Sequence, residues 1–384
     1  MTTTLTTTGW VSDDLIGVWT PSADSVTDLN GGIVNPEGNV ANTLAGRDSI
    51  VGSGGEFGRG ISNSGTIDTG AGNDSIFGSS ASEFGTGIYN NGTIDTGAGN
   101  DSICAIATGD SSTGIVNSAG TINTGHGNDS ISGKGRGIGI LNSRGTINTG
   151  DGIDSISGTG AGFGILNLGN INTGNGNDSI VGCASANSSR GIQNSNTIST
   201  GNGNDCIIGS TSGDESYTIF NTSDSTIDTG DGNDSIVGIA SGSGSNGIFN
   251  IGTINTGAGN DLIVGSGSGG ARSGIFNIGI IDTGAGNDTI IANGGFADGN
   301  GSVNLGTGND YLKGVGGGSF NGGDGQDTLE LTTGTYTVGI SGTTIAFQIS
   351  EFITMETSGF EKLIAGRTIY NFTSLTNGQT ITVA

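Results

Sequence analysis

Aspartate recurs in one fixed setting along most of this chain, at the end of the phrase Thr-Gly-x-Gly-Asn-Asp. One copy spans residues 256–261, and an aliphatic stretch, Leu262 to Val264, follows it. A carboxylate held at the end of a glycine turn is a hard oxygen donor, and a ring of such donors is the environment that calcium prefers. The aligned aspartates are Asp74, Asp101, Asp129, Asp154, Asp178, Asp205, Asp234, Asp261, Asp288, Asp310 and Asp327.

Two glycines stand four and two residues before each aspartate of this series. Glycine takes positive φ without a steric penalty, so we expect the backbone to curl with several carbonyls facing inward while the carboxylate closes the ring. The phrase therefore predicts bound calcium at each turn. The glycines that illustrate it are Gly70, Gly72, Gly97, Gly99, Gly257, Gly259, Gly284 and Gly286.

A further acidic position precedes the Thr-Gly pair in four copies. These residues can add oxygens to the row of ions, or they can form a solvated outer face, and the sequence leaves both interpretations open. They are Asp68, Asp95, Asp228 and Asp282.

Extended to Gly-x-Gly-Asn-Asp-x-Ile-x-Gly, the phrase resembles the hemolysin-type calcium-binding (RTX) nonapeptide, over roughly residues 46–329. The resemblance implies several calcium ions between stacked coils of a β-roll, a secreted chain at the cell surface or outside the cell, and folding that depends on the ion. Three copies depart from the family pattern: two have Ile153 and Gln326 in the place of asparagine, and a degenerate copy at Asp48 lacks most of the turn. Residues 330–384 resemble the C-terminal region that RTX proteins present to type I secretion systems.

The repeat itself predicts the fold. Most steps between successive aspartates are 24 to 29 residues, and each copy holds three short aliphatic strands, with Ile248, Ile254 and Ile263 as inward residues in one of them. We expect an all-β protein: a right-handed parallel β-solenoid, RTX-like, of about 10–11 coils with roughly 27 residues per coil. The predicted domains are an N-terminal cap or assembly segment at 1–31, the calcium-binding repeats at 32–329, and a C-terminal cap with the secretion-like region at 330–384.

Two more features of the repeat bear on function. An asparagine follows the Gly-Ile-x strand in each copy, for example Asn63, Asn90 and Asn117, and stacked amides of this kind predict a hydrogen-bonded ladder. Insertions such as 211–215 fall between the strand that follows the aspartate and the next Gly-Ile strand. This variable corner is where we expect specificity for a partner to reside.

Composition narrows the functional class. The chain of 384 residues has 81 glycines, 31% hydrophobic residues and a formal charge of −25, which disfavours nucleic acid as a partner. No apolar run is long enough for a transmembrane segment, and Met1 to Leu5 does not resemble a cleavable signal. One histidine, His126, and evenly spread acids offer no catalytic set, so we expect no enzyme.

These observations favour a secreted calcium-binding structural protein that folds on calcium and self-associates into an extracellular fibre, surface layer or matrix. The alternative is a monomeric, calcium-stabilised adhesin or glycan-binding module that uses the variable-corner loops, with cell-surface polysaccharide as its partner.

Overall fold

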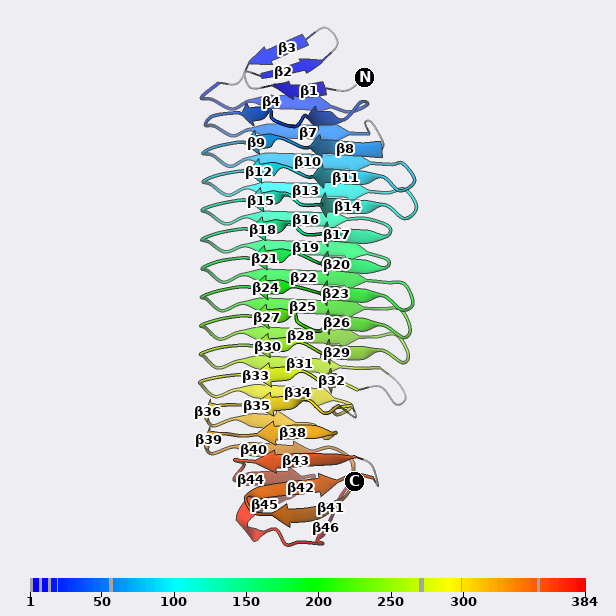
Figure 1. The fold of residues 1–384 in the computed structure, drawn as a ribbon, viewed down its shortest axis with the longest axis vertical. Helices are drawn as coiled ribbons and strands as arrows, with labels where there is room; N and C mark the ends of the chain where they lie inside the picture. Colours follow the sequence, from blue (N-terminus) through cyan, green and yellow to red (C-terminus); the bar gives the residue numbers. More distant parts are fainter. Residues whose placement is uncertain are drawn as a thin grey trace.

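Three parallel strands recur in each coil because each copy of the repeat has three aliphatic stretches separated by glycine- and asparagine-rich turns. The computed structural model describes residues 3–6, 9–12, 15–18, 20–54, 58–268, 273–297, 299–350 and 353–384, and shows a rod of stacked coils (Figure 1). Apart from 3-10 turns at Gly58 and at Phe372–Ser374, the regular structure of these residues is all strand. The predicted β-solenoid of about ten coils of roughly 27 residues is confirmed.

The strands form three long sheets and one short one. The 13-stranded sheet runs in the order β3 (Leu15–Val18), β2 (Gly9–Ser12), β1 (Thr3–Thr6), β5 (Ile33–Asn35), β8 (Arg59–Asn63), β11 (Thr86–Asn90), β14 (Thr113–Asn117), β17 (Ile138–Asn142), β20 (Phe163–Asn167), β23 (Arg190–Asn194), β26 (Tyr217–Asn221), β29 (Asn246–Asn250) and β32 (Ile275–Asn277). The 15-stranded sheet follows the aspartate turns and runs in the order β4 (Ser25–Asp28), β7 (Ser49–Ser53), β10 (Ser75–Ser80), β13 (Ser102–Ala107), β16 (Ser130–Lys134), β19 (Ser155–Gly160), β22 (Ser179–Ala184), β25 (Cys206–Thr211), β28 (Ser235–Ala240), β31 (Leu262–Ser266), β34 (Thr289–Asn293), β37 (Tyr311–Lys313), β40 (Thr328–Leu331), β44 (Lys362–Ala365) and β45 (Thr368–Asn371).

The third long sheet precedes the turns. It has 16 strands, in the order β46 (Thr380–Val383), β41 (Gly334–Ser341), β42 (Thr344–Gln348), β43 (Thr354–Ser358), β38 (Gly318–Asn321), β35 (Ser302–Asn304), β33 (Ile280–Asp282), β30 (Thr253–Asn255), β27 (Thr226–Asp228), β24 (Thr197–Ser199), β21 (Asn170–Asn172), β18 (Thr146–Asn148), β15 (Thr121–Asn123), β12 (Thr93–Asp95), β9 (Thr66–Asp68) and β6 (Val40–Asn42). β36 (Thr307–Gly308) and β39 (Asp324–Gly325) form the short sheet.

The core consists of three isoleucine columns, one for each long sheet. Ile76, Ile88 and Ile94 are fully buried in one coil and pair in register with Ile103, Ile115 and Ile122 of the next. Full burial of one such side chain contributes about 1.5–3 kcal/mol, but a single coil cannot enclose its three isoleucines alone. Stability therefore comes from stacking.

The asparagine ladder is also confirmed. The Asn63 side-chain amide donates to Oδ1 of Asn90 at 2.7 Å and to the carbonyl of Thr93 at 2.8 Å, and Asn90 continues to Asn117 at 2.9 Å. These side chains are fully buried. Each amide acts as donor and acceptor at once, so the column satisfies itself along the rod.

Two corners of the coil behave differently. The connection from the 16-stranded to the 15-stranded sheet stays at the same length, as in 96–101, 124–129 and 256–261. The connection from the 15-stranded to the 13-stranded sheet varies, from 135–137 to 212–216 and 267–274. The variable corner thus lies where the insertions predicted it.

The ends depart from the parallel pattern. β1, β2 and β3 pair antiparallel, while β4 already pairs in parallel with β7. Residues 1–2, 7–8, 13–14 and 19 of the predicted N-terminal segment lie outside the described residues. After β40 the strands β41, β42, β43 and β46 pair antiparallel, and buried Tyr336, Phe347 and Phe372 pack beneath them. No helix within the described residues is long and apolar enough to cross a membrane.

Candidate functional site

The glycines of the turn are required by the close stacking of the coils. Gly97 has φ +84° and Gly99 has φ +146°, a region that disfavours side chains. A Cβ atom on Gly97 would lie 1.8 Å from the carbonyl oxygen of Gly70, and one on Gly99 would lie 1.4 Å from that of Gly72. The same contacts recur at Gly257, Gly259, Gly284 and Gly286, so no larger residue fits these positions.

Some of the turn carbonyls accept hydrogen bonds from the neighbouring coil. The Ala98 N–H donates to the Gly70 carbonyl at 3.0 Å, and the Gly72 N–H donates to the Ala98 carbonyl at 2.8 Å. The parallel ladder therefore continues through the turn, because the backbone N–H groups here need acceptors and the neighbouring coil supplies them. In most of these turns the carbonyl of the first glycine accepts a hydrogen bond from the next coil.

The predicted aspartates do come together, as a column that we call the carboxylate column. The Asp74 N–H donates to Oδ1 of Asp101 at 2.7 Å, and the Asp101 N–H donates to Oδ1 of Asp129 at 2.8 Å. The pattern holds through Asp154 and Asp327 despite their altered preceding residues. All eleven aspartates are at most 2% exposed.

Each carboxylate of this series keeps one oxygen without a hydrogen-bond partner. The Oδ2 atom is buried and unpaired in all eleven. The Thr69 hydroxyl lies beside the Asp74 carboxylate, but its one hydrogen is donated to the Thr96 carbonyl at 3.3 Å. At the N-terminal end of the column, the Thr43 hydroxyl lies 2.5 Å from Oδ2 of Asp48 and 3.1 Å from the Thr69 carbonyl.

Burial makes these carboxylates unusually weak acids. Loss of solvent raises the pKa of every member of the series, and the neighbouring carboxylates above and below raise the pKa further in several members. The pKa reaches about 6 for Asp101, Asp178 and Asp288, and about 7 for Asp234 and Asp310. The column holds more negative charge than its own donors stabilise.

Two members of the carboxylate column, Asp24 and Glu361, were not predicted. The Asp24 N–H donates to Oδ1 of Asp48 at 2.7 Å, and the Asp327 N–H donates to Oε2 of Glu361 at 2.7 Å. The only sequence signal is an acid directly before a short strand, as in Asp24-Ser25-Val26, because neither residue has the glycine turn.

The four additional acids lie on the outer side of the 16-stranded sheet. Asn123 donates to Asp95 at 3.0 Å, Asn255 to Asp228 at 2.9 Å and Asn304 to Asp282 at 3.1 Å, so they belong to a surface ladder. Asp68 accepts from Asn42 at 2.7 Å. Burial, and then the adjacent Asp95, raise the pKa of Asp68.

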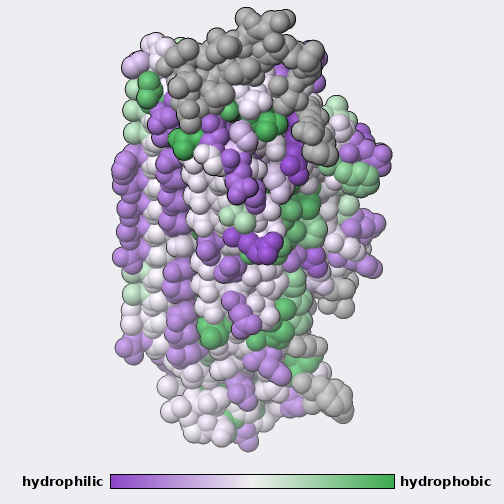
Figure 2. Space-filling model, turned by 45° about the horizontal axis from the view of Figure 1, so that its top comes forward, coloured by the Kyte–Doolittle hydropathy of each residue, from purple (hydrophilic) through white to green (hydrophobic). Residues whose placement is uncertain are grey.

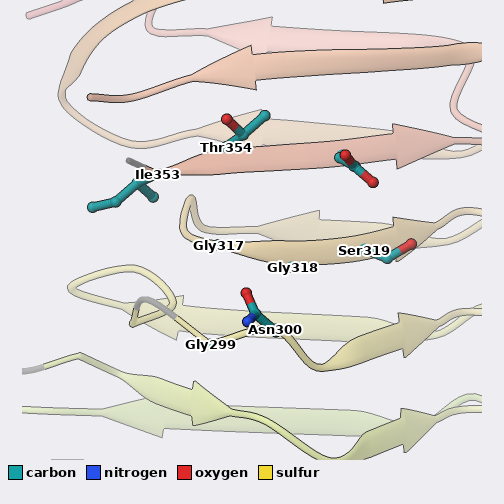
Figure 3. A pocket seen from close by; sticks show the side chains of 8 residues that line it. Gly299, Asn300, Gly317, Gly318, Ser319, Ile353 and Thr354 are labelled. Atoms are coloured by element: carbon teal, nitrogen blue, oxygen red, sulfur yellow. The ribbon is translucent and has the colours of Figure 1, made fainter. Parts of the chain in front are cut away.

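The surface pockets contain few side chains that could bind a ligand or catalyse a reaction. A cavity of about 350 Å³ lies where the coils shorten, lined by Asn300, Ser319, Thr354 and Glu356 among others (Figure 3). Its one carboxylate is that of Glu356. His126 is exposed on the turn, with Nδ1 at 3.3 Å from Oδ2 of Asp151.

The donor set of the carboxylate column consists of oxygen alone, which fits calcium rather than a softer metal. In the described parts of the chain, no three or more side chains of His, Cys, Asp or Glu converge on one point. An ion at this corner would therefore be held by the carboxylates of stacked aspartates, such as Asp205 and Asp234, together with neutral oxygens of the turn.

Comparison with models of known protein families found no match. Comparison with curated proteins found no relative either.

Proposed function

We propose that this chain is a calcium-stabilised structural rod, secreted from the cell, that self-associates into an extracellular fibre, surface layer or matrix. The observation that carries the proposal is the carboxylate column, with eleven buried carboxylate oxygens that have no partner. A buried acceptor without a donor costs about 1–3 kcal/mol, and more when it is charged. A cation at each turn would remove that cost.

The aspartates would supply Oδ2 to the ions, while their Oδ1 atoms go on accepting the N–H groups of the preceding coil. Calcium supplies positive charge and a flexible oxygen coordination shell. Because successive carboxylates belong to different coils, ion binding and coil stacking are the same event, and the free energy of binding becomes free energy of folding.

The structural role follows from what the rod offers. Its buried polar groups form ladders along the axis, and the outer faces repeat the same side chains from coil to coil. On the 16-stranded sheet a repeated outer residue is threonine, as in Thr66, Thr93 and Thr121, and such a regular surface suits association with other rods. The secreted location rests on the resemblance of residues 330–384 to a type I secretion region.

The test is a calcium titration of the full chain, monitored by far-ultraviolet circular dichroism at pH 7.5. We expect a coil-like spectrum in chelator and a strand spectrum at millimolar calcium, with magnesium at the same concentration as a control. A variant with Asp178, Asp205 and Asp234 changed to Asn should need less calcium to fold and bind fewer ions by equilibrium dialysis. A wild-type chain that binds no calcium would refute the proposal.

A further inference from the structure

The outer side of the 13-stranded sheet carries a column of large apolar side chains. The position after each buried core isoleucine points outward and is half-buried along the nine strands from β8 to β32. From the N-terminal end the column reads Ser62, Tyr89, Val116, Leu141, Leu166, Gln193, Phe220, Phe249 and Phe276. We call the outer side of these nine strands the apolar face.

The aromatic part of this face is held in place by contacts between coils. Phe249 and Phe276 stack with ring centroids 4.4 Å apart, and Phe220 meets Phe249 edge to face at 5.0 Å. Arg190 lies over the Phe220 ring at 4.8 Å, and Arg59 covers Tyr89 at 3.6 Å. A face built this way loses little side-chain entropy when a partner docks.

The apolar face is also free of acids. Its nine strands hold two arginines and no aspartate or glutamate, in a chain that has 35 acids. The 16-stranded sheet, in contrast, presents Asp68, Asp95, Asp228 and Asp282. In Figure 2 hydrophobic residues gather along the right-hand side of the rod, and columns of hydrophilic residues follow the left-hand side.

We propose that the apolar face docks against the same face of a second copy of this chain, with the two rods side by side. Two chains of charge −25 repel each other, and pairing through acid-free faces keeps their acidic columns apart. The 15-stranded sheet is nearly acid-free too, but its outer column carries smaller side chains. It reads Phe77, Cys104, Ser132, Ser157, Val181, Ile208, Val237, Val264 and Ile291, with one aromatic ring against the four of the apolar face.

The size of the face fits a dimer. Nine strands spaced about 4.8 Å apart span roughly 43 Å, and a five-residue strand is about 17 Å long, which gives roughly 700 Å² per copy. A stable interface takes about 800 Å² per partner. Residues of the neighbouring corners would supply the remainder.

This inference rests on the rod of the proposed function, and it names the surface through which the rods associate. The experiment measures mass and fold separately. Analytical ultracentrifugation of the full chain in calcium, over a wide concentration range, gives the mass, while circular dichroism of the same samples gives the fold. We expect a concentration-dependent dimer.

Phe249→Asp places a carboxylate in the middle of the face and should weaken dimerisation by about tenfold or more, equivalent to about 1.4 kcal/mol. Gln193→Asp makes the same change at a position that is already polar, so it tests the face even if Phe249→Asp fails to fold. Val237→Asp, on the outer side of the 15-stranded sheet, is the matched control and should dimerise like the wild type.

A wild-type chain that is folded and monomeric at every concentration would overturn the proposal, including one that instead binds a polysaccharide through its aromatic residues. Equal weakening by Val237→Asp and Gln193→Asp would overturn it as well. If dimers form but the circular dichroism does not respond to calcium, the docking surface stands and the calcium proposal fails.

Discussion

Two buried polar columns run along the same rod, and they differ in how completely their side chains are hydrogen-bonded. In the asparagine ladder each side chain from Asn35 to Asn250 donates at least two hydrogen bonds and accepts at least one, as Asn167 does with Asn142, Asn194 and Thr197. In the carboxylate column each side chain accepts one backbone N–H and leaves Oδ2 unpaired. An amide is both donor and acceptor, so a column of amides can hydrogen-bond from coil to coil along the whole rod. A carboxylate only accepts, so it cannot donate to the carboxylate of the next coil. The second column therefore needs a proton or a cation from outside.

The largest expected effect comes from acid, because the whole column contributes. In chelator, the folded-state pKa of each aspartate lies above the ordinary value of 3.8, so the folded chain binds protons more tightly than the unfolded chain. This contribution to stability is complete below about pH 4 and is lost as the pH rises through about 6 to 7. We expect the strand signal of the metal-free chain in circular dichroism to increase as the pH falls from 7.5 to 5, and this change to shrink in calcium. A strand signal in chelator that decreases over this range would contradict the comparison.

Moving a carboxylate into the other column should have the next largest effect. Asn167→Asp removes the donors to Asn194 Oδ1 and to the Thr197 carbonyl, and it buries a charge whose second oxygen faces these two acceptors while the Asn142 amide still donates to the first. We expect a loss of about 3–5 kcal/mol at pH 7, seen as faster hydrogen–deuterium exchange in the coils on either side.

The control for that change is Asn167→Gln, which keeps the amide and alters only its reach. If Asn167→Asp exchanged no faster than the wild type, the distinction between the two columns would be wrong.

The reverse exchange is expected to stabilise the metal-free chain. Asp234→Asn keeps an oxygen for the Asp205 N–H and replaces the unpaired, charged side chain by a neutral one. Removing a buried unsatisfied acceptor should gain about 1–3 kcal/mol at pH 7.5, measured as a fall in the calcium concentration at the midpoint of folding. In saturating calcium the same variant should be less stable than the wild type. Stabilisation under both conditions would exclude an ion at this turn.

The smallest effect belongs to the surface ladder, which mixes the two side chains. Asp68 and Asp95 are successive acids in that ladder, and Asp95→Asn would place an amide donor between Asp68 and Asn123. We expect a gain of about 0.2–1 kcal/mol at low ionic strength that fades at high salt. Asp228→Asn is the control and should gain less, because the neighbour of Asp228 on the other side of the ladder is Ser199 rather than a second acid.

Much of the fold could be predicted from the sequence because the sequence repeats at a nearly constant spacing. The isoleucine columns, the buried Asn63 ladder and the alignment of Asp74 through Asp327 follow from spacing alone, since a regular period fixes which residues stack. The sequence did not show which turn carbonyls bond along the rod, because the partner of the Gly70 carbonyl is an N–H in the neighbouring coil rather than a group of the same turn. Glu361 was missed because it lies 34 residues beyond Asp327, where the period has ended.

Both ends of the carboxylate column are closed by the chain itself. Thr20 donates its N–H and its hydroxyl to the carboxylate of Asp24, and at the other end the Glu361 N–H donates to the Asp327 carbonyl. A second copy placed end to end would find no unpaired carboxylate at Asp24 and no unpaired N–H at Glu361 through which to continue this column. The length of the rod is therefore set by its number of coils. In an array of rods packed side by side, that length would set the repeat distance along the rod axis.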